Sequence, residues 1–408
     1  RIEDQFGNLV TTDNTTVVTA TRSAGAGTLQ GTLTKTAVNG LAVFANLNHQ
    51  VATNISILFT AGGLTSVTSS NIVVNPAAAS QLVFRTQPGS ATAGLAFGTQ
   101  PVVGTRDAFG NDSIVGLASS LNVTATLSAG VGVLQGTTSL NIGTSGGNGT
   151  VTFTDLRLDA AGSDKQLTGA APGLANAVSS VFTVGVGAFA KLQLLVPGET
   201  AAPGTGSGKT GTPTARTAGT PFTISVNAVD ANWNQVSSTD TEGITSNDVN
   251  ATLPANGALV AGSRTFSVTL KTSGTRTLTA TDITDGTKTA NTSPSITVNA
   301  GTFVKMQLLV PGETASPGSA TGKTGAPVAA TAGTPFNVTV NAVDANWNTV
   351  GTVTHTVGIT SSDANAALPA NTVLVAGTQT LSVTLKTSGT RTLTATDITD
   401  GTKTANTS

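Results

Sequence analysis

Residues 202–212 read APGTGSGKTGT and contain Gly208-Lys209-Thr210, the three residues that close a nucleotide phosphate-binding loop. Such a loop also needs a glycine five positions before Gly208 and a helix after the threonine, because backbone N–H groups and the helix N-terminus hold the phosphates. The chain has Pro203 at the first position and continues as GTPTARTAGTP at the second. A second copy, SPGSATGKTGA at 316–326, has Pro317 at the same place. We therefore expect a Pro/Gly-rich loop without bound nucleotide.

Aspartate and asparagine recur four residues apart in polar turns and form the best-defined polar constellation of the sequence. One interpretation is an Asx-type turn, since both side chains bond nearby backbone and tolerate left-handed conformations. The other is a cation site, with Ca²⁺ as the expected ion. Calcium needs about six to eight oxygen ligands, and Asp282/Asp285 and Asp397/Asp400 add carboxylates only if the fold brings them close. The candidate ligands are Asp107, Asn111, Asp230, Asn234, Asp344 and Asn348, with Asp4 and Asn8 as an earlier copy. No other metal or cofactor is indicated.

Two tryptophans, Trp233 and Trp347, lie within two of these turns, in place of the glycine that the other copies have. We interpret them as interface residues that pack as a lid against a neighbouring domain, with stacking on a sugar or a partner surface as the alternative. The two histidines, His49 and His355, lie in different repeats, and neither accompanies a nucleophile or a set of metal ligands. We therefore expect no catalytic residues and no enzyme activity.

Composition restricts both the class of protein and the class of partner. Of the 408 residues, 38% are hydrophobic and 10% are charged, which favours globular cores over disorder. The net charge is −1 and no basic run occurs, so nothing supports binding to nucleic acid. No apolar run approaches the roughly 18 residues of a membrane-spanning helix. The absence of cysteine excludes disulfides and thiolate metal sites.

Internal repeats predict the domain organisation. KLQLLVPGET at 191–200 recurs as KMQLLVPGET at 305–314, and VTATRSAGAGTLQG at 18–31 resembles VTATLSAGVGVLQG at 123–136. Four related units in two subtypes are therefore expected. The predicted domains are 1–76, which lacks its first strands, 77–186, 187–300, and 301–408, which lacks its last strand. Because the chain opens on Arg1 rather than methionine, we interpret it as an excerpt from a longer or processed protein.

Alternation of apolar and polar residues predicts strands throughout. Phe222, Ile224 and Val226 alternate with polar residues, and no window carries a convincing helical stripe. Asp285-Gly286 predicts a tight hairpin, because glycine tolerates positive φ. Short strands with turns about every ten residues are typical of β-sandwiches. The expected fold class is all-β, with tandem immunoglobulin-like β-sandwich domains that form an extended rod.

A recurring pattern carries a family resemblance. Ala-Gly-x-x-Phe at 93–97, 218–222 and 332–336 is followed by an alternating strand and then by the Asp-x-x-Gly/Trp-Asn turn. This order resembles the bacterial immunoglobulin-like domains of invasin- and intimin-type adhesins and of other large surface adhesins and filament proteins, and it covers essentially the whole chain.

The resemblance implies a non-enzymatic, extracellular structural protein of the bacterial cell surface. It would be a repeat-built stalk or a filament subunit. Because the first and last units are expected to lack strands, the subunits could assemble by strand exchange. The expected partners are neighbouring repeats or other copies of the chain. The alternative is an adhesin that binds a glycan or a host or cell-surface protein through its loops.

Overall fold

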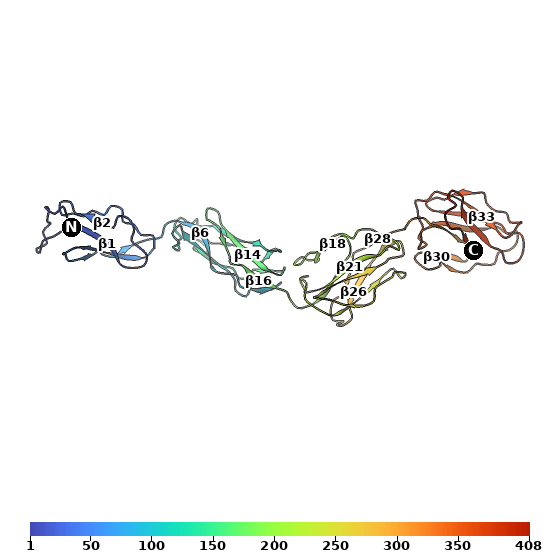
Figure 1. Ribbon diagram of the computed structural model, residues 1–408, viewed down its shortest axis with the longest axis horizontal. Helices are drawn as coiled ribbons and strands as arrows, with labels where there is room; N and C mark the ends of the chain where they lie inside the picture. The colour runs from blue at the N-terminus through green and yellow to red at the C-terminus, as the bar shows by residue number, and fades with distance from the viewer. The chain divides into compact units, whose positions relative to one another are not determined.

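The computed structural model describes residues 1–408, and every regular element in it is a β-strand (Figure 1). The predicted all-β fold class is confirmed. No helix of the length and hydropathy needed to cross a membrane occurs. The chain divides into two compact units, residues 1–185 and 186–408.

Strand pairing falls into four groups, which we call modules 1 to 4. They comprise residues 3–73, 79–185, 191–299 and 305–407, and no strand of one module pairs with a strand of another. Modules 1 and 2 belong to the first unit, and modules 3 and 4 belong to the second. The domain boundaries expected near 76, 186 and 300 stay a prediction.

Module 3 shows how the alternating sequence builds a sandwich. One sheet consists of β17 (Lys191–Leu195), β21 (Phe222–Val229) and β24 (Ser263–Val268). The facing sheet consists of β23 (Gly257–Ala258), β22 (Thr241–Ser246), β26 (Leu278–Asp282) and β27 (Asn291–Thr292). Ile224 and Val226 of the first sheet share one core with Leu278 and Ala280 of the second. A small sheet of β20 (Arg216–Thr217), β28 (Ile296–Asn299) and β25 (Gly274–Arg276) closes this core.

Module 4 repeats the two facing sheets of module 3 but has no counterpart of the small third sheet. Its sheets are β29 (Lys305–Leu309), β32 (Phe336–Val343) and β35 (Thr378–Val383), and β34 (Thr372–Val373), β33 (Thr356–Ser361), β36 (Leu393–Asp397) and β37 (Asn406–Thr407). Met306, Leu308 and Val340 lie in its core. Each module of this unit also carries a short hairpin, β18 (Glu199–Ala201) with β19 (Lys209–Gly211) and β30 (Glu313–Ala315) with β31 (Lys323–Gly325).

In the first unit, module 2 is a complete sandwich. β12 (Thr150–Thr152), β8 (Val102–Asp107) and β6 (Ala79–Thr86) form one sheet. The larger sheet contains β11 (Ser139–Asn141), β9 (Asn122–Ala129), β14 (Gly162–Ala170), β16 (Phe182–Gly185), β7 (Ala91–Thr92) and β15 (Ala177–Val178). β10 (Leu134–Gln135) pairs with β13 (Arg157–Leu158). Phe84, Val103 and Phe153 meet in one core.

Module 1 contains a single sheet, and its core is correspondingly smaller. The sheet consists of β1 (Val17–Ala24), β2 (Thr34–Thr36), β3 (Asn54–Ala61), β4 (Val67–Thr68) and β5 (Ile72–Val73). Its buried side chains form two separate clusters, around Ile55 and around Val18.

One local prediction is wrong. Asp285-Gly286 does not form a two-residue hairpin, because β26 and β27 pair through Thr279 and Thr292 and leave a longer connection between them. Within that connection, the N–H of Lys288 donates to the carbonyl of Asp285, and Gly286 does not adopt positive φ. The Asp285 carboxylate stabilises this turn by accepting the N–H of Thr287 at 3.0 Å. The side chain of the aspartate, and not the flexibility of the glycine, shapes the turn.

Candidate functional site: the joints between modules

The segment that ends in Gly208-Lys209-Thr210 is the β18–β19 hairpin of module 3, not a phosphate-binding loop. Lys209 Nζ lies 2.9 Å from Glu199 Oε1 and donates to the Leu194 carbonyl at 3.2 Å. The Glu199 side chain is buried, and that of Lys209 is mostly buried. The lysine is therefore used for an internal ion pair that fastens the hairpin to the sandwich. Lys323 and Glu313 repeat the pair in module 4 at 2.8 Å.

Each tryptophan packs against the hairpin of its own module. Trp233 has φ of +69° and Trp347 has φ of +66°, so both keep the left-handed turn that glycine adopts in modules 1 and 2. A Cβ atom on Gly208 would lie 2.2 Å from the indole ring of Trp233, so only glycine fits beneath it. The indole N–H donates to the Gly206 carbonyl at 3.2 Å.

A lysine on the first strand of each of these modules completes the cluster. Lys191 Nζ lies 3.5 Å from the centre of the Trp233 ring, and Lys305 Nζ lies 3.4 Å from that of Trp347, which is cation–π geometry. Burial lowers the pKa of both lysines. These contacts lie within one module, and the interface role of the two tryptophans stays a prediction.

The Asp-x-x-x-Asn turns share one hydrogen-bond pattern. In module 4, Asp344 Oδ1 accepts the N–H groups of Asn346 at 2.8 Å and of Asn348 at 2.9 Å, and the Asn348 amide donates to both oxygens. The turns at Asp4, Asp107 and Asp230 have the same contacts from the residues two and four positions later. An Asx-type turn accounts for this geometry. No group of three or more His, Asp or Glu side chains converges as a metal site in residues 1–408, and calcium binding at these turns stays a prediction.

In modules 2, 3 and 4, the second carboxylate oxygen of the turn holds the segment that leads into the module. Asp107 Oδ2 accepts the N–H of Ala77 at 2.9 Å, and Asp344 Oδ2 accepts that of Gly301 at 2.7 Å. Asp230 holds Gly187 in the same way at 2.8 Å. Burial raises the pKa of Asp107, but the hydrogen bonds from Asn111, Ala77 and Phe109 outweigh it and leave the pKa below its ordinary value. The aspartate is thus held ionised at the entrance of the module.

The asparagine of the turn reaches the preceding module of the same unit. Asn348 Nδ2 donates to the Lys271 carbonyl at 2.9 Å, and Asn348 Oδ1 accepts the N–H of Ser273 at 2.8 Å. In the first unit, Asn111 Nδ2 donates to the Gln50 carbonyl at 2.8 Å, and its Oδ1 accepts the N–H of Ala52 at 2.9 Å. Each amide therefore pairs with a peptide segment of its neighbour through one donor and one acceptor. We call this arrangement the amide joint.

The loop that receives Asn348 is fixed by module 3 itself. Asp248 accepts the N–H of Lys271 at 2.7 Å and that of Thr272 at 2.9 Å, and the Thr272 hydroxyl donates to it at 2.6 Å. Burial raises the pKa of Asp248, but these hydrogen bonds outweigh it and leave the pKa below its ordinary value. Asn250 Nδ2 adds a second contact to module 4, at 3.2 Å from the Pro317 carbonyl. Both halves of the joint are therefore preorganised.

Sequence reasoning found one half of this joint and missed the other. The Asp and Asn residues were expected as turn or cation residues, and the structure adds a role toward the adjacent module. Asp248 and the 271–273 loop were not expected, although Asp363 and Lys386 recur at the matching positions of module 4. That recurrence of an aspartate before a Lys-Thr-Ser segment was the available signal.

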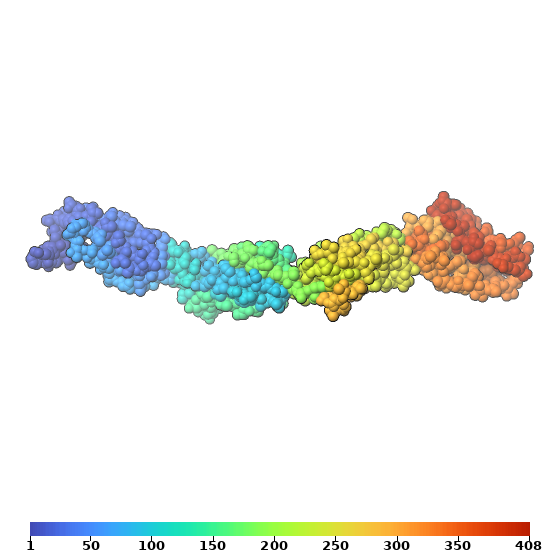
Figure 2. Space-filling model, turned by 60° about the horizontal axis from the view of Figure 1, so that its bottom comes forward, coloured from blue at the N-terminus to red at the C-terminus, as the bar shows by residue number.

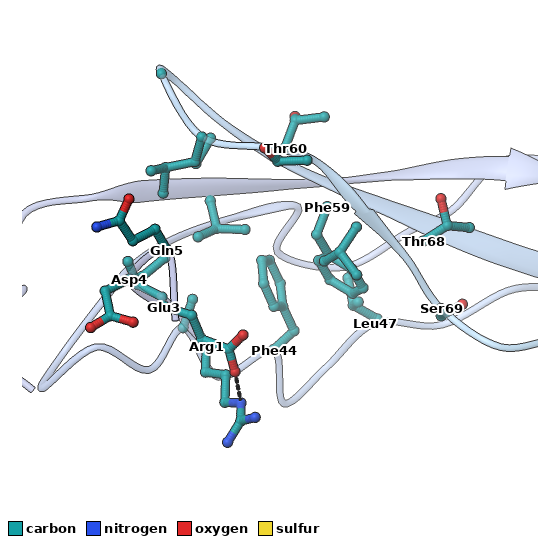
Figure 3. Close-up of a pocket in the computed structure, with 18 residues that line it drawn as sticks. Arg1, Glu3, Asp4, Gln5, Phe44, Leu47, Phe59, Thr60, Thr68 and Ser69 are labelled. Carbon is teal, nitrogen blue, oxygen red and sulfur yellow. Dashed lines mark ion pairs between the residues drawn. The ribbon is translucent and has the colours of Figure 1, made fainter. Parts of the chain in front are cut away.

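Module 1 carries a large cleft. The cleft has a volume of about 950 Å³, and it hollows the surface beside the N-terminal residues of the first unit (Figure 2). Phe44, Leu47 and Phe59 lie together within it, and Arg1 and Glu3 form an ion pair at its rim (Figure 3). In module 2, the position of Phe44 is taken by Phe153, which packs under β6 and β8.

Comparison with known proteins gives no family. No protein-family model matches the chain, and no curated protein matches it. Among solved structures, the chain is similar to the S-layer protein rSbsC(31-844), with 17% identity, a TM-score of 0.22, and coverage of 98% of this chain and 47% of that one. It is also similar to the D0-D1 domain of intimin, with 14% identity, a TM-score of 0.20, and coverage of 53% and 97%. A β-glycosidase from Bacteroides vulgatus has 11% identity, a TM-score of 0.21, and coverage of 54% and 24%.

Similarity at these TM-scores carries no argument about function. The chain spans only 24% of the β-glycosidase and 47% of the S-layer protein.

Proposed function

We propose that this chain is a non-enzymatic structural protein of the bacterial cell surface, a stalk or filament subunit built from repeated β-sandwich modules. The amide joint is the observation that carries the proposal. Asn111 and Asn348 make the same two hydrogen bonds to the preceding module, although modules 2 and 4 belong to different subtypes.

The chemistry of the joint suits an array of copied modules. Asn348 bonds main-chain groups of residues 271 and 273, and main-chain groups are present whatever the side chains are. The stability of a repeat array depends on each module and on the interface with its neighbour. Because the receiving groups belong to the main chain, a module can be duplicated without a matched change of side chains in the loop that receives the asparagine.

Negative-stain electron microscopy of the 1–408 protein tests this role. We expect rod-like particles with a narrow distribution of angles between adjacent modules, and a wider distribution after Asn348→Ala. The matched control is Asn365→Ala, which removes one exposed hydrogen bond within module 4. Compact particles, or an angular distribution that Asn348→Ala leaves unchanged, contradict the proposal. Antibody labelling of intact cells tests the surface location independently.

The cleft of module 1 supports the finer proposal of strand exchange. Val18 and Phe44 line it, and the residues at the corresponding positions of module 2, Val123 and Phe153, share one core with Leu82 and Phe84 of β6. We propose that a second molecule donates an extended apolar strand to this cleft, as in β-strand addition. A synthetic peptide with the sequence of residues 79–86 should bind the 1–408 protein. The same peptide with Leu82→Asp and Phe84→Asp should not bind, and equal binding of both peptides contradicts the proposal.

A further inference from the structure

Two buried carboxyl groups face one another in module 3. Glu242 on β22 pairs directly with Asp282 on β26. Directly opposed residues of an antiparallel pair project from the same face of the sheet. On these strands that face is the core face, since it also carries Ile244 and Ala280. Glu242 is 0% exposed and Asp282 is 2% exposed, so both carboxyl groups have left water.

Three oxygen atoms of this pair have no hydrogen-bond partner. They are Oε1 and Oε2 of Glu242 and Oδ2 of Asp282. The other oxygen of Asp282 accepts the N–H groups of Thr284 and Asp285, both at 2.9 Å. Two buried anions side by side would lack both solvation and a counter-charge, which is costly unless one of them takes up a proton.

In module 4 the corresponding aspartate has a hydrogen-bond partner for the same oxygen. This aspartate, Asp397, lies 2.7 Å through Oδ2 from Nδ1 of His355, and the imidazole packs edge-on against Phe303. Module 3 has Asp240 in place of His355 and Glu242 in place of Val357. The aspartate of module 3 therefore lies opposite an acidic residue and lacks the histidine that its counterpart has in module 4.

The other charged groups around the pair do not replace that partner. Asp240 precedes β22 and adds negative charge. Arg264 on β24 lies against Gly257, which pairs with Glu242 from β23, but its guanidinium donates to the Ala258 carbonyl at 2.9 Å. Lys288 is paired with Asp285 at 3.0 Å. Burial, with Asp282 and Asp240 as further causes, raises the pKa of Glu242 to about 8.

We propose that Glu242 and Asp282 hold one proton between them at neutral pH, so that module 3 contains a carboxyl–carboxylate proton site that module 4, with Val357 in place of Glu242, does not have. The bond is an O–H of the Glu242 carboxyl that donates to Asp282 Oδ2. Glu242 is ionised in the unfolded chain at pH 7, so folding of module 3 takes up one proton from solvent. The folded group has the higher pKa, so its contribution to stability is complete below pH about 4.5 and is lost as the pH rises through about 8. One linked proton changes the folding equilibrium constant by at most about tenfold per pH unit.

The two tryptophans allow each module to be followed separately in the 1–408 protein, because they are the only two and lie in modules 3 and 4. Trp347→Phe leaves Trp233 as the fluorescent reporter of module 3, and Trp233→Phe leaves Trp347 as the reporter of module 4. Urea unfolding is measured with each reporter at pH values from 5 to 9. We expect the midpoint of module 3 to fall between pH 5 and 8 when Glu242 is present, and we expect Glu242→Gln to leave the pH dependence of module 4 unchanged. Glu242→Gln, and Glu242→Val as the residue of module 4, should remove this slope.

Three further measurements decide between a proton and other occupants. Infrared spectroscopy at pH 7 should show a protonated carboxyl band that Glu242→Gln removes. If Arg264→Gln instead lowers the midpoint of module 3 strongly and no pH slope is present, Glu242 is ionised and paired with Arg264, and the proposal is wrong. If millimolar Ca²⁺ restores the midpoint at pH 9, a metal cation occupies the pair, which also overturns it. An unchanged slope in Glu242→Gln overturns it as well.

Discussion

Replacement of Asn348 by alanine should weaken a module that does not contain this residue. The asparagine belongs to module 4, but two of its hydrogen bonds, of 2.9 and 2.8 Å, end on the backbone of module 3. Unfolding of module 3 alone breaks both of them. The Asn348→Ala variant does not form these two hydrogen bonds, so module 4 no longer stabilises module 3 through them.

The magnitude follows from these two bonds. An intramolecular hydrogen bond contributes about 1 kcal/mol net, and the freed groups of Lys271 and Ser273 are half-buried, so water can reach them after the change. We expect module 3 to lose about 2 kcal/mol in its free energy of unfolding, or roughly 30-fold in its folding equilibrium constant. Module 4 should lose more than this, because its unfolding breaks the same two bonds and also those that Asn348 donates to the Asp344 carboxyl group.

Native-state hydrogen exchange measured by mass spectrometry resolves the two effects. The core strands β21 and β32 read FTISVNAV and FNVTVNAV, so their peptides differ in mass and can be assigned. Amides of β21 should exchange about 30-fold faster in Asn348→Ala, and Asn365→Ala should leave them unchanged. If β32 exchanges faster while β21 keeps its wild-type rate, the amide joint does not couple the modules and the reasoning is refuted.

Three further predictions concern module 3 and are measured by urea or acid unfolding. Gly208→Ala should cost about 3 kcal/mol, because its Cβ atom meets the Trp233 ring and the position has positive φ, and Trp233→Gly should reduce that cost to about 1 kcal/mol. Equal costs in both backgrounds would show that the ring does not impose the glycine. Glu199→Gln should cost about 2 kcal/mol, because it leaves the mostly buried Lys209 unpaired, and a cost below about 0.5 kcal/mol would contradict this. Asp248 has a lowered pKa, so it stabilises the module at pH values above the ordinary pKa of aspartate, and this contribution is lost as the pH falls. Asp248→Asn should therefore be less stable at pH 7, and its free energy of unfolding should change less with pH in the acid range. An unchanged acid slope would refute the assignment.

The sequence alone determined the all-β fold class of the protein and its internal repetition. Alternation at Phe222, Ile224 and Val226 requires a strand with one buried face, because successive side chains of a strand point to opposite sides. Pro203 in place of glycine excluded a phosphate loop, because that loop depends on local backbone conformation. Such inferences succeed since they involve residues close together in the chain.

What the tertiary structure decided depends on residues far apart in the chain. Asn348 meets the 271–273 loop only because two modules are placed end to end, and its spacing from Asp344 predicts just the local turn. Glu242 and Asp282 lie opposite one another only through the register of β22 and β26, and their sequence separation contains no sign of it. The chemistry of a carboxyl group is set by what surrounds it, and folding supplies those surroundings.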